Sequence, residues 1–227
     1  MPNGLAKMTE FLGTNHSFNM SPDEFRDLLE ERTDEQLIGA CLLEGQAPYV
    51  FEPRPDRWDK FLDELASDLN VSREDIRVVG SARFGFSMKP GHNLRSFRDK
   101  SDIDVVVVNP RLFDHLWLAS LAAAYPRAAI LGRLGGWLGR RKNEVYTGWL
   151  SPLETKLDIS IYGRNAKPVT DFNAQWFNAL KRASTHPVRR HEDIKGRLYR
   201  TWRHAELYHL HSLGELRRSL AKVRIEG

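Results

Sequence analysis

Two aspartates at the entrance to a run of four valines constrain this chain more than any other feature. Asp102 and Asp104 flank Ile103 and lead directly into Val105–Val108. Side chains of a strand alternate between its two faces, so we expect both carboxylates on one face, while Ile103 points into the core on the other. Two like charges this close repel each other unless a positive charge lies between them. Oxygen ligands of this kind suit Mg²⁺, which makes the segment a candidate cation site.

A glycine and a serine upstream of the aspartates supply a complementary feature. Gly80 and Ser81 end the short apolar run Ile76–Val79, which we expect to be a strand. Glycine allows the backbone to approach a ligand closely. The amides and the hydroxyl that follow can donate hydrogen bonds to phosphate oxygens. An anion cradle next to a cation site indicates a pocket for a metal–nucleoside triphosphate complex.

This succession of elements resembles the nucleotidyltransferase superfamily typified by DNA polymerase beta. The resemblance covers roughly residues 58–163 and implies an α/β (α+β) fold, with a mixed sheet flanked by helices. Members of that family carry a third carboxylate on a neighbouring strand, and Asp158 within the alternating run 156–162 matches it. Lys156, in the same run, is assigned a structural role rather than a place in the site.

The resemblance also implies an activity and a set of site residues. Two Mg²⁺ ions, or Mn²⁺ in their place, would be held by the catalytic residues Asp102, Asp104 and Asp158. The nucleotide would be bound by Gly80, Ser81, Arg83 and Ser101, although Arg83 is equally compatible with a surface salt bridge. The reaction would transfer a nucleoside monophosphate from a nucleoside triphosphate to a hydroxyl group and release pyrophosphate.

The acceptor of the nucleotide is left open by the sequence. A nucleotide, an RNA or a protein is favoured, in a setting such as bacterial antiviral (phage) defence or a toxin–antitoxin pair. The spacing of Gly85 from Gly80-Ser81 is similar to that of oligonucleotide synthases, which usually have longer chains. One alternative is a small-molecule (antibiotic) nucleotidyltransferase. Another is a catalytically silent module of the same fold that binds a nucleotide or a partner subunit, and a homo-oligomer also stays open.

The loop between the two motifs is long and basic. Twenty residues separate Ser81 from Asp102, and they include Arg95, Arg98 and Lys100. Loops of this length in compact domains are often functional. Two interpretations are equally compatible with the sequence: a mobile flap over the triphosphate, and a plain surface loop.

The composition is that of an ordinary globular protein. The chain has 227 residues, of which 41% are hydrophobic and 28% charged, and a net charge of +4. This basic balance is compatible with a triphosphate or nucleic-acid partner without requiring one. A single cysteine, Cys41, fits a reducing compartment and is expected to be a core residue. Because no apolar run is long enough for a bilayer and no secretory signal is visible, we expect a cytoplasmic protein without a membrane partner.

The remaining pattern predicts a flexible arm, a catalytic core and a helical end. We place the arm at residues 1–20, the nucleotidyltransferase core at 21–167 and a C-terminal helical segment at 168–227. Ser21 and Thr33 are expected to cap two helices, and Trp58–Leu69 to form a third that ends at Asn70. Further helices are expected at 112–124, where Tyr125-Pro126 would stop the helix, at 172–180 and from about 192 to 220.

Residues 127–148 are glycine-rich and basic. We favour a solvated loop over a segment that tracks a phosphate backbone, followed by a strand near 145–150. His204, His209 and His211 do not share a helical face, so packed or solvated histidines are favoured over metal ligands. Trp176, Tyr199 and Trp202 are assigned to the core rather than to stacking on a nucleobase.

Overall fold

The computed structural model describes residues 20–39, 47–52, 54–98, 101–128, 134–152, 163–186 and 193–226. Its helices and strands have the following bounds: α2 Pro22–Glu31, α3 Asp34–Ile38, α4 Pro55–Leu69, β1 Ile76–Val79, α5 Ser81–Phe84, β2 Ile103–Val108, α6 Pro110–Ala128, α7 Leu134–Thr147, β3 Trp149–Leu150, α9 Lys167–Ala183, β4 Ile194–Tyr199 and α10 Trp202–Glu226. Short 3₁₀ turns occur at Tyr49–Phe51, Arg73–Asp75 and Gly163–Ala166.

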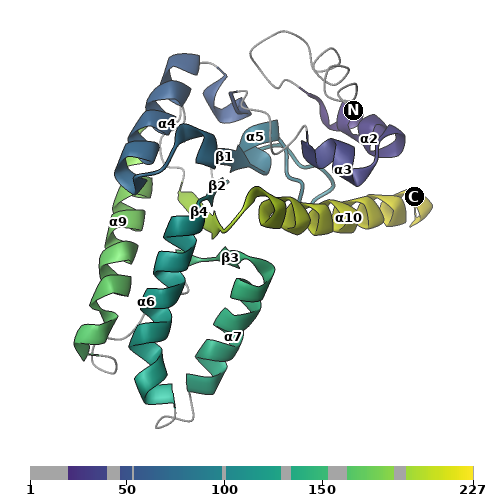
Figure 1. Cartoon of the computed structure of the whole chain (residues 1–227). Helices are drawn as coiled ribbons and strands as arrows, with labels where there is room; N and C mark the ends of the chain where they lie inside the picture. The colour runs from purple at the N-terminus through teal and green to yellow at the C-terminus, as the bar shows by residue number, and fades with distance from the viewer. Residues whose placement is uncertain are drawn as a thin grey trace, which may run out of the picture.

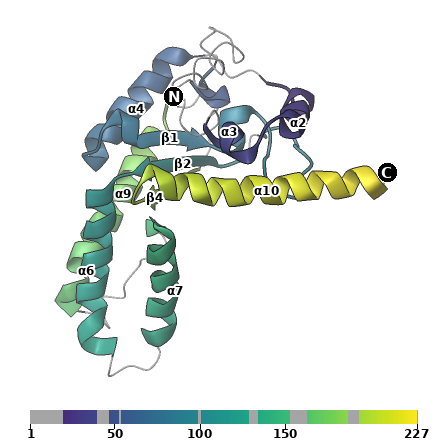
Figure 2. The same ribbon diagram turned by 45° about the vertical axis from the view of Figure 1, so that its right-hand side comes forward.

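Among the described residues, four strands form a central mixed sheet in the order β1-β2-β4-β3. β1 pairs antiparallel with β2, β2 pairs parallel with β4, and β3 pairs antiparallel with β4. Figure 1 shows α4 and α9 on one side of this sheet and α10 running out from its other side, below α2 and α3. α6 and α7 extend away from the sheet next to each other (Figures 1 and 2). The expected α/β (α+β) class, a mixed sheet flanked by helices, is therefore confirmed.

The sheet separates two hydrophobic cores. On β2, Ile103, Val105 and Val107 belong to the larger core, which α4, α6 and α9 complete. Val106 and Val108 belong to the second core, which contains residues of α2, α3 and α10. Both faces of β2 are thus covered, which explains why its sequence is almost continuously apolar. The face shared by Asp102 and Asp104 is the one toward the second core.

Local capping signals place several helices where the sequence predicts them. The Ser21 side chain accepts a hydrogen bond from the backbone of Glu24, and the Glu24 side chain accepts one in return. Thr33 and Gln36 form the same reciprocal arrangement at the start of α3. α4 ends at Asn70, whose left-handed backbone (φ 53°) terminates the helix. The helix at 172–180 is confirmed as part of α9, and strand 76–79 as β1.

The prediction of one long helix from about residue 192 is wrong. Residues 194–199 form β4, and the helix begins only at Trp202. Ile194, Leu198 and Trp202 recur at helical spacing, but on β4 the alternate residues Ile194 and Leu198 also share a face and pack in the larger core. Thr201 accepts a hydrogen bond from the backbone N–H of His204, which starts α10 at that point.

The segment after β2 is more helical than its sequence indicates. α6 continues past Pro126 to Ala128, and α7 occupies most of the stretch predicted as a loop. Pro126 lies in the last turn of α6 and removes one backbone donor there, but the helix continues for two more residues. Arg141 and Glu144, one helical turn apart, form a buried ion pair at 2.6 Å on α7. The predicted strand near 145–150 is reduced to β3, because Val145 still belongs to α7.

Some predictions fall outside the described residues. They concern most of the arm at 1–20, Cys41, Lys100, Lys156 and the strand that carries Asp158. The division at residues 167 and 168 stays a prediction, although β4 from the C-terminal segment lies inside the central sheet. None of the described helices combines the length and the apolar character required to cross a bilayer.

Candidate functional site

A cavity of about 720 Å³ opens at the end of the sheet where β2 begins. Its walls come from the β1–α5 turn, the start of β2, the polar face of β4, the loop at 87–96 and the middle of α10. Of the residues that the sequence nominates, Gly80, Ser81, Ser101, Asp102 and Asp104 line it. The fold therefore brings together two motifs that lie about twenty residues apart in the chain.

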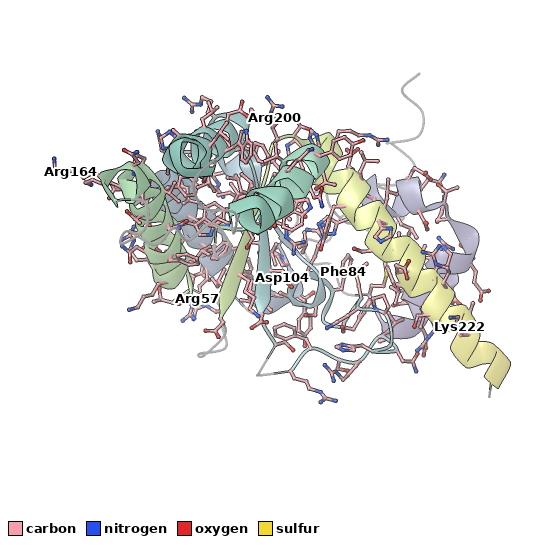
Figure 3. All side chains as sticks on the ribbon, turned by 90° about the horizontal axis from the view of Figure 1, so that it is seen from below. Arg57, Phe84, Asp104, Arg164, Arg200 and Lys222 are labelled. Atoms are coloured by element: carbon pink, nitrogen blue, oxygen red, sulfur yellow. The ribbon has the colours of Figure 1, made fainter. Side chains whose placement is uncertain are left out.

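Asp102 and Asp104 face this cavity from the same side of the sheet. The Asp102 side chain is 38% exposed, and Asp104 is exposed between two fully buried neighbours. Solvent reaches Asp104 through the cavity that it lines, while protein atoms surround the rest of the group. Burial among these atoms, together with the charge of Asp102, raises the pKa of Asp104 above its ordinary value, and Arg197 and Lys195 partly offset this. Figure 3 shows Asp104 near the centre of the molecule, and Phe84, which is also labelled there, lines the same cavity.

Gly80 brings the backbone close to Asp104. Its φ of +65° lies in the region that side-chain-bearing residues avoid, and a Cβ at this position would lie 3.5 Å from Asp104 Oδ2. The Gly80 carbonyl accepts hydrogen bonds from the N–H groups of Arg83 and Phe84, which closes the turn that begins α5. Ser81, the first residue of α5, also lines the cavity. The backbone of Gly80 thus lies close to Asp104, one of the candidate catalytic residues.

Ser101 and Arg83 occupy different environments. The Ser101 hydroxyl accepts a hydrogen bond from the Arg98 N–H at 3.0 Å, which fixes the chain just before β2. Arg83 does not line the cavity and is only 1% exposed, with its guanidinium 6.0 Å from the centre of the Phe84 ring. Arg83 is therefore a buried residue next to the site and not a surface residue.

Cations, rather than a further acid, occupy the strand next to the aspartates. Asp158 lies outside the described residues, and the strand that pairs with β2 on this side is β4. Asp104 is in register with Lys195, and Val106 with Arg197. The Lys195 ammonium donates a hydrogen bond to Asp102 and forms an ion pair with it. Because the sequence pattern predicts a helix here, it does not reveal that Lys195, Arg197 and Tyr199 alternate along a strand. In a strand, these three side chains lie on the same face of the sheet as the aspartates.

Arg197 is held in an aromatic setting. Its guanidinium lies 4.7 Å from the centre of the Trp149 ring and 4.4 Å from that of Tyr208. Cation–π contacts with two rings restrict the positions that an arginine side chain can adopt. Because Arg197 lines the cavity, it presents a fixed positive charge to the same space as Asp104.

The histidines of α10 behave as the sequence predicts. His209 packs against the rings of Tyr199 and Tyr208, and burial followed by the charge of Arg197 lowers its pKa to about 4. His204 is hydrogen-bonded to Thr201 at 2.7 Å, and His211 is exposed. Trp176 and Tyr199 are buried at 1% and 0% exposure, which confirms their assignment to the core.

The long basic loop forms one wall of the cavity. Lys89, His92 and Arg95 line it. Two hydrogen bonds join the loop to other elements: the Gly91 N–H donates to the Ser219 hydroxyl on α10 at 2.9 Å, and Arg26 on α2 donates to the Asn93 side chain at 3.2 Å. The choice between a mobile flap and a plain surface loop stays open, but Lys89, His92 and Arg95 do face the candidate site.

The donor set fits a hard divalent cation. Asp102 and Asp104 offer carboxylate oxygens to one cavity, and Mg²⁺ is commonly held by one or two carboxylates together with phosphate oxygens and water. Within the described part of the chain, no three His, Cys, Asp or Glu side chains gather in a way that would hold a metal ion. The described residues could therefore offer two carboxylate ligands to a metal, and phosphate and water would have to provide the others.

Comparisons of the chain with protein-family models, with curated proteins and with solved structures gave no match.

Proposed function

We propose that the chain is a metal-dependent nucleotidyltransferase. The observation that carries this proposal is the shared cavity of Gly80, Ser81, Asp102 and Asp104, with the backbone of Gly80 next to the Asp104 carboxylate. Two acids in one cavity with Lys195, Arg197 and the basic loop form a site with both signs of charge. A metal–triphosphate complex, which is itself a cation bound to a polyanion, matches such a site better than a neutral ligand does.

The reaction would be a displacement at the α-phosphorus. The oxygen of an acceptor hydroxyl forms a bond to this phosphorus, the bond between the phosphorus and the oxygen that bridges to the β-phosphate breaks, and pyrophosphate leaves. The hydroxyl proton passes to solvent. The bound metal supplies a lowered pKa of the hydroxyl and neutralisation of phosphate charge.

The residues of the chain have positioning and electrostatic roles in this reaction. Asp102 and Asp104 hold the metal, and Ser81 donates to a phosphate oxygen beside Gly80. Arg197, held against two rings, contributes a preorganised positive charge near the phosphates. Phosphoryl transfer requires little covalent chemistry of the protein, so positioning of this kind accounts for most of the catalysis.

The test is incubation with each α-labelled nucleoside triphosphate and Mg²⁺ or Mn²⁺, alone, with bulk RNA and with cell lysate. Label in a small molecule, in RNA or in protein identifies the acceptor class. The variant Asp102→Asn/Asp104→Asn should lose at least ~10³-fold in rate. Asp171→Asn, which changes an exposed carboxylate of α9, is the matched control. Undiminished pyrophosphate release by the double variant would refute the assignment.

A second candidate is a catalytically silent module that binds a nucleotide or a partner. The Lys195–Asp102 ion pair favours it, because one of the two acids already has a positive partner. The same assay separates the two candidates: the silent module would be stabilised by a triphosphate but would yield no labelled product.

A further inference from the structure

Lys195 is placed to interact with either component of a metal–triphosphate complex. It lines the cavity, lies in register with Asp104 on the adjacent parallel strand and makes an ion pair with Asp102. Its ammonium therefore occupies space beside the two carboxylates in which a metal ion would lie. An ammonium fixed at this place would compete with the metal. The mobility of the Lys195 side chain therefore decides whether it favours or opposes binding of the metal–triphosphate complex.

The ion pair is of the kind that breaks easily. The Lys195 side chain is 64% exposed and that of Asp102 is 38% exposed. Ion pairs between groups this accessible contribute little to stability, because water and salt screen them and because ordering a long side chain costs entropy. Lys195 can therefore leave Asp102 and pair with another anion without a large loss of stability.

The backbone of Lys195 is fixed, while its side chain is not. Gly196 packs so closely on Trp176 that a Cβ there would lie 2.6 Å from Trp176 Cζ2. Trp176 is 1% exposed, so this contact holds β4 against α9. Only the flexible four-carbon stem of Lys195 is free to redirect the ammonium.

We infer that Lys195 exchanges partners: its ammonium neutralises Asp102 while the cavity is empty and turns to a phosphate oxygen when the metal–triphosphate complex enters. This inference rests on the proposed function, because it needs Asp102 to be released to the metal. Lys195 is then a binding residue that protects the acid pair between turnovers. It differs from Arg197, whose guanidinium is held in contact with the Trp149 and Tyr208 rings.

The exchange predicts effects of opposite sign in the variant Lys195→Met, which keeps most of the apolar stem. Without a competing ammonium, affinity for Mn²⁺ alone should rise about two- to fivefold. Affinity for the preformed Mg²⁺–tripolyphosphate complex should fall about tenfold, because a charged hydrogen bond to phosphate is lost. Isothermal titration calorimetry measures both, and tripolyphosphate avoids any dependence on the nucleobase. Lys195→Arg should restore most of the tripolyphosphate affinity.

Lys167→Met is the matched control, since it removes another exposed lysine that pairs with an aspartate, Asp171, outside the cavity. It should leave both affinities unchanged. Weakening of both affinities in Lys195→Met would mean a structural role, strengthening of both would mean that Lys195 only blocks the site, and no change would place it outside the site. Each of these results overturns the exchange.

The measurements do not depend on turnover. If opposite signs are found but no nucleotide is transferred, the exchange holds and the transferase assignment fails. If the parent protein binds neither Mn²⁺ nor Mg²⁺–tripolyphosphate, the proposed function and the exchange are both refuted.

Discussion

Replacement of Gly196 by alanine tests the position of β4 in the sheet. A Cβ on Gly196 would lie 2.6, 3.0 and 3.1 Å from three atoms of the Trp176 ring, whereas ordinary contacts begin at 3.4 Å. The ring would have to move by several tenths of an ångström. It is almost fully buried and stacks on Phe172 at an interplanar angle of 18°, so little space is available. Overpacking of this kind costs about 1–3 kcal/mol.

The sign of the effect separates a strand from a helix. If residues 192–220 formed one continuous helix, as their apolar spacing suggests, Gly196→Ala would instead stabilise the protein by about 0.5–1 kcal/mol. Gly214→Ala is the internal control, because Gly214 lies within α10 and the atom nearest to its added Cβ is 3.7 Å away. We expect Gly214→Ala to raise stability by up to about 1 kcal/mol.

Urea unfolding, monitored by circular dichroism, measures the free energy of unfolding of both variants. For Gly196→Ala we expect a free energy of unfolding about 2 kcal/mol below that of the parent, with a melting temperature lower by roughly 4–8 °C. Parallel increases in stability for the two glycine variants would refute the strand assignment and the contact with Trp176. Equal slopes of the unfolding curves are required for the comparison to be valid.

Two further variants test the surroundings of the site. Gly148→Ala should lower the free energy of unfolding by about 2 kcal/mol or more, because Gly148 has φ +73° and a Cβ there would overlap the His204 ring. In urea unfolding, the added change His204→Ala should recover the stability lost to this overlap but not the stability lost to backbone strain. Full recovery would contradict a strained backbone at this position. The folded-state pKa of His209 is lowered to about 4 from its ordinary value of 6.5, so His209 takes up a proton more readily when the protein is unfolded. Its contribution to stability is therefore present above pH ~6.5 and is lost as the pH falls toward 4. This loss amounts to at most roughly 3 kcal/mol. His209→Gln should therefore lose less stability than the parent between these pH values, whereas His211→Gln, at an exposed position, should follow the parent; identical curves for the parent and His209→Gln would show that His209 is accessible to protons in the folded state.

Local chemistry explains which parts of the fold could be predicted from the sequence. Ser21 and Thr33 cap their helices through side-chain hydrogen bonds to residues three positions away, so no distant contact is needed to recognise them. Period-two alternation places Asp102 and Asp104 on one face for the same reason. The proximity of Gly80 to Asp104 followed from the resemblance rather than from any local rule.

The errors arise where distant contacts decide the structure. Residues 194–199 have a spacing compatible with a helix and become a strand because β2 and β3 provide partners on both sides. On α7, several glycines disfavour a helix locally, yet a buried pair between Arg141 and Glu144 accompanies the helix that forms. The cationic wall of the candidate site was missed as a consequence, since Lys195 and Arg197 reach the aspartates only from a strand.

The order of strands in the sheet also affects how the chain is made. β4 lies between β2 and β3, yet it is the last strand in the sequence. During synthesis, β2 with its run of valines emerges from the ribosome long before residue 199 and must wait with one edge unpaired. An exposed apolar edge of this kind is a template for association with other chains. Nascent or truncated chains that lack residues 194–199 are therefore the species most prone to aggregate and to need chaperones.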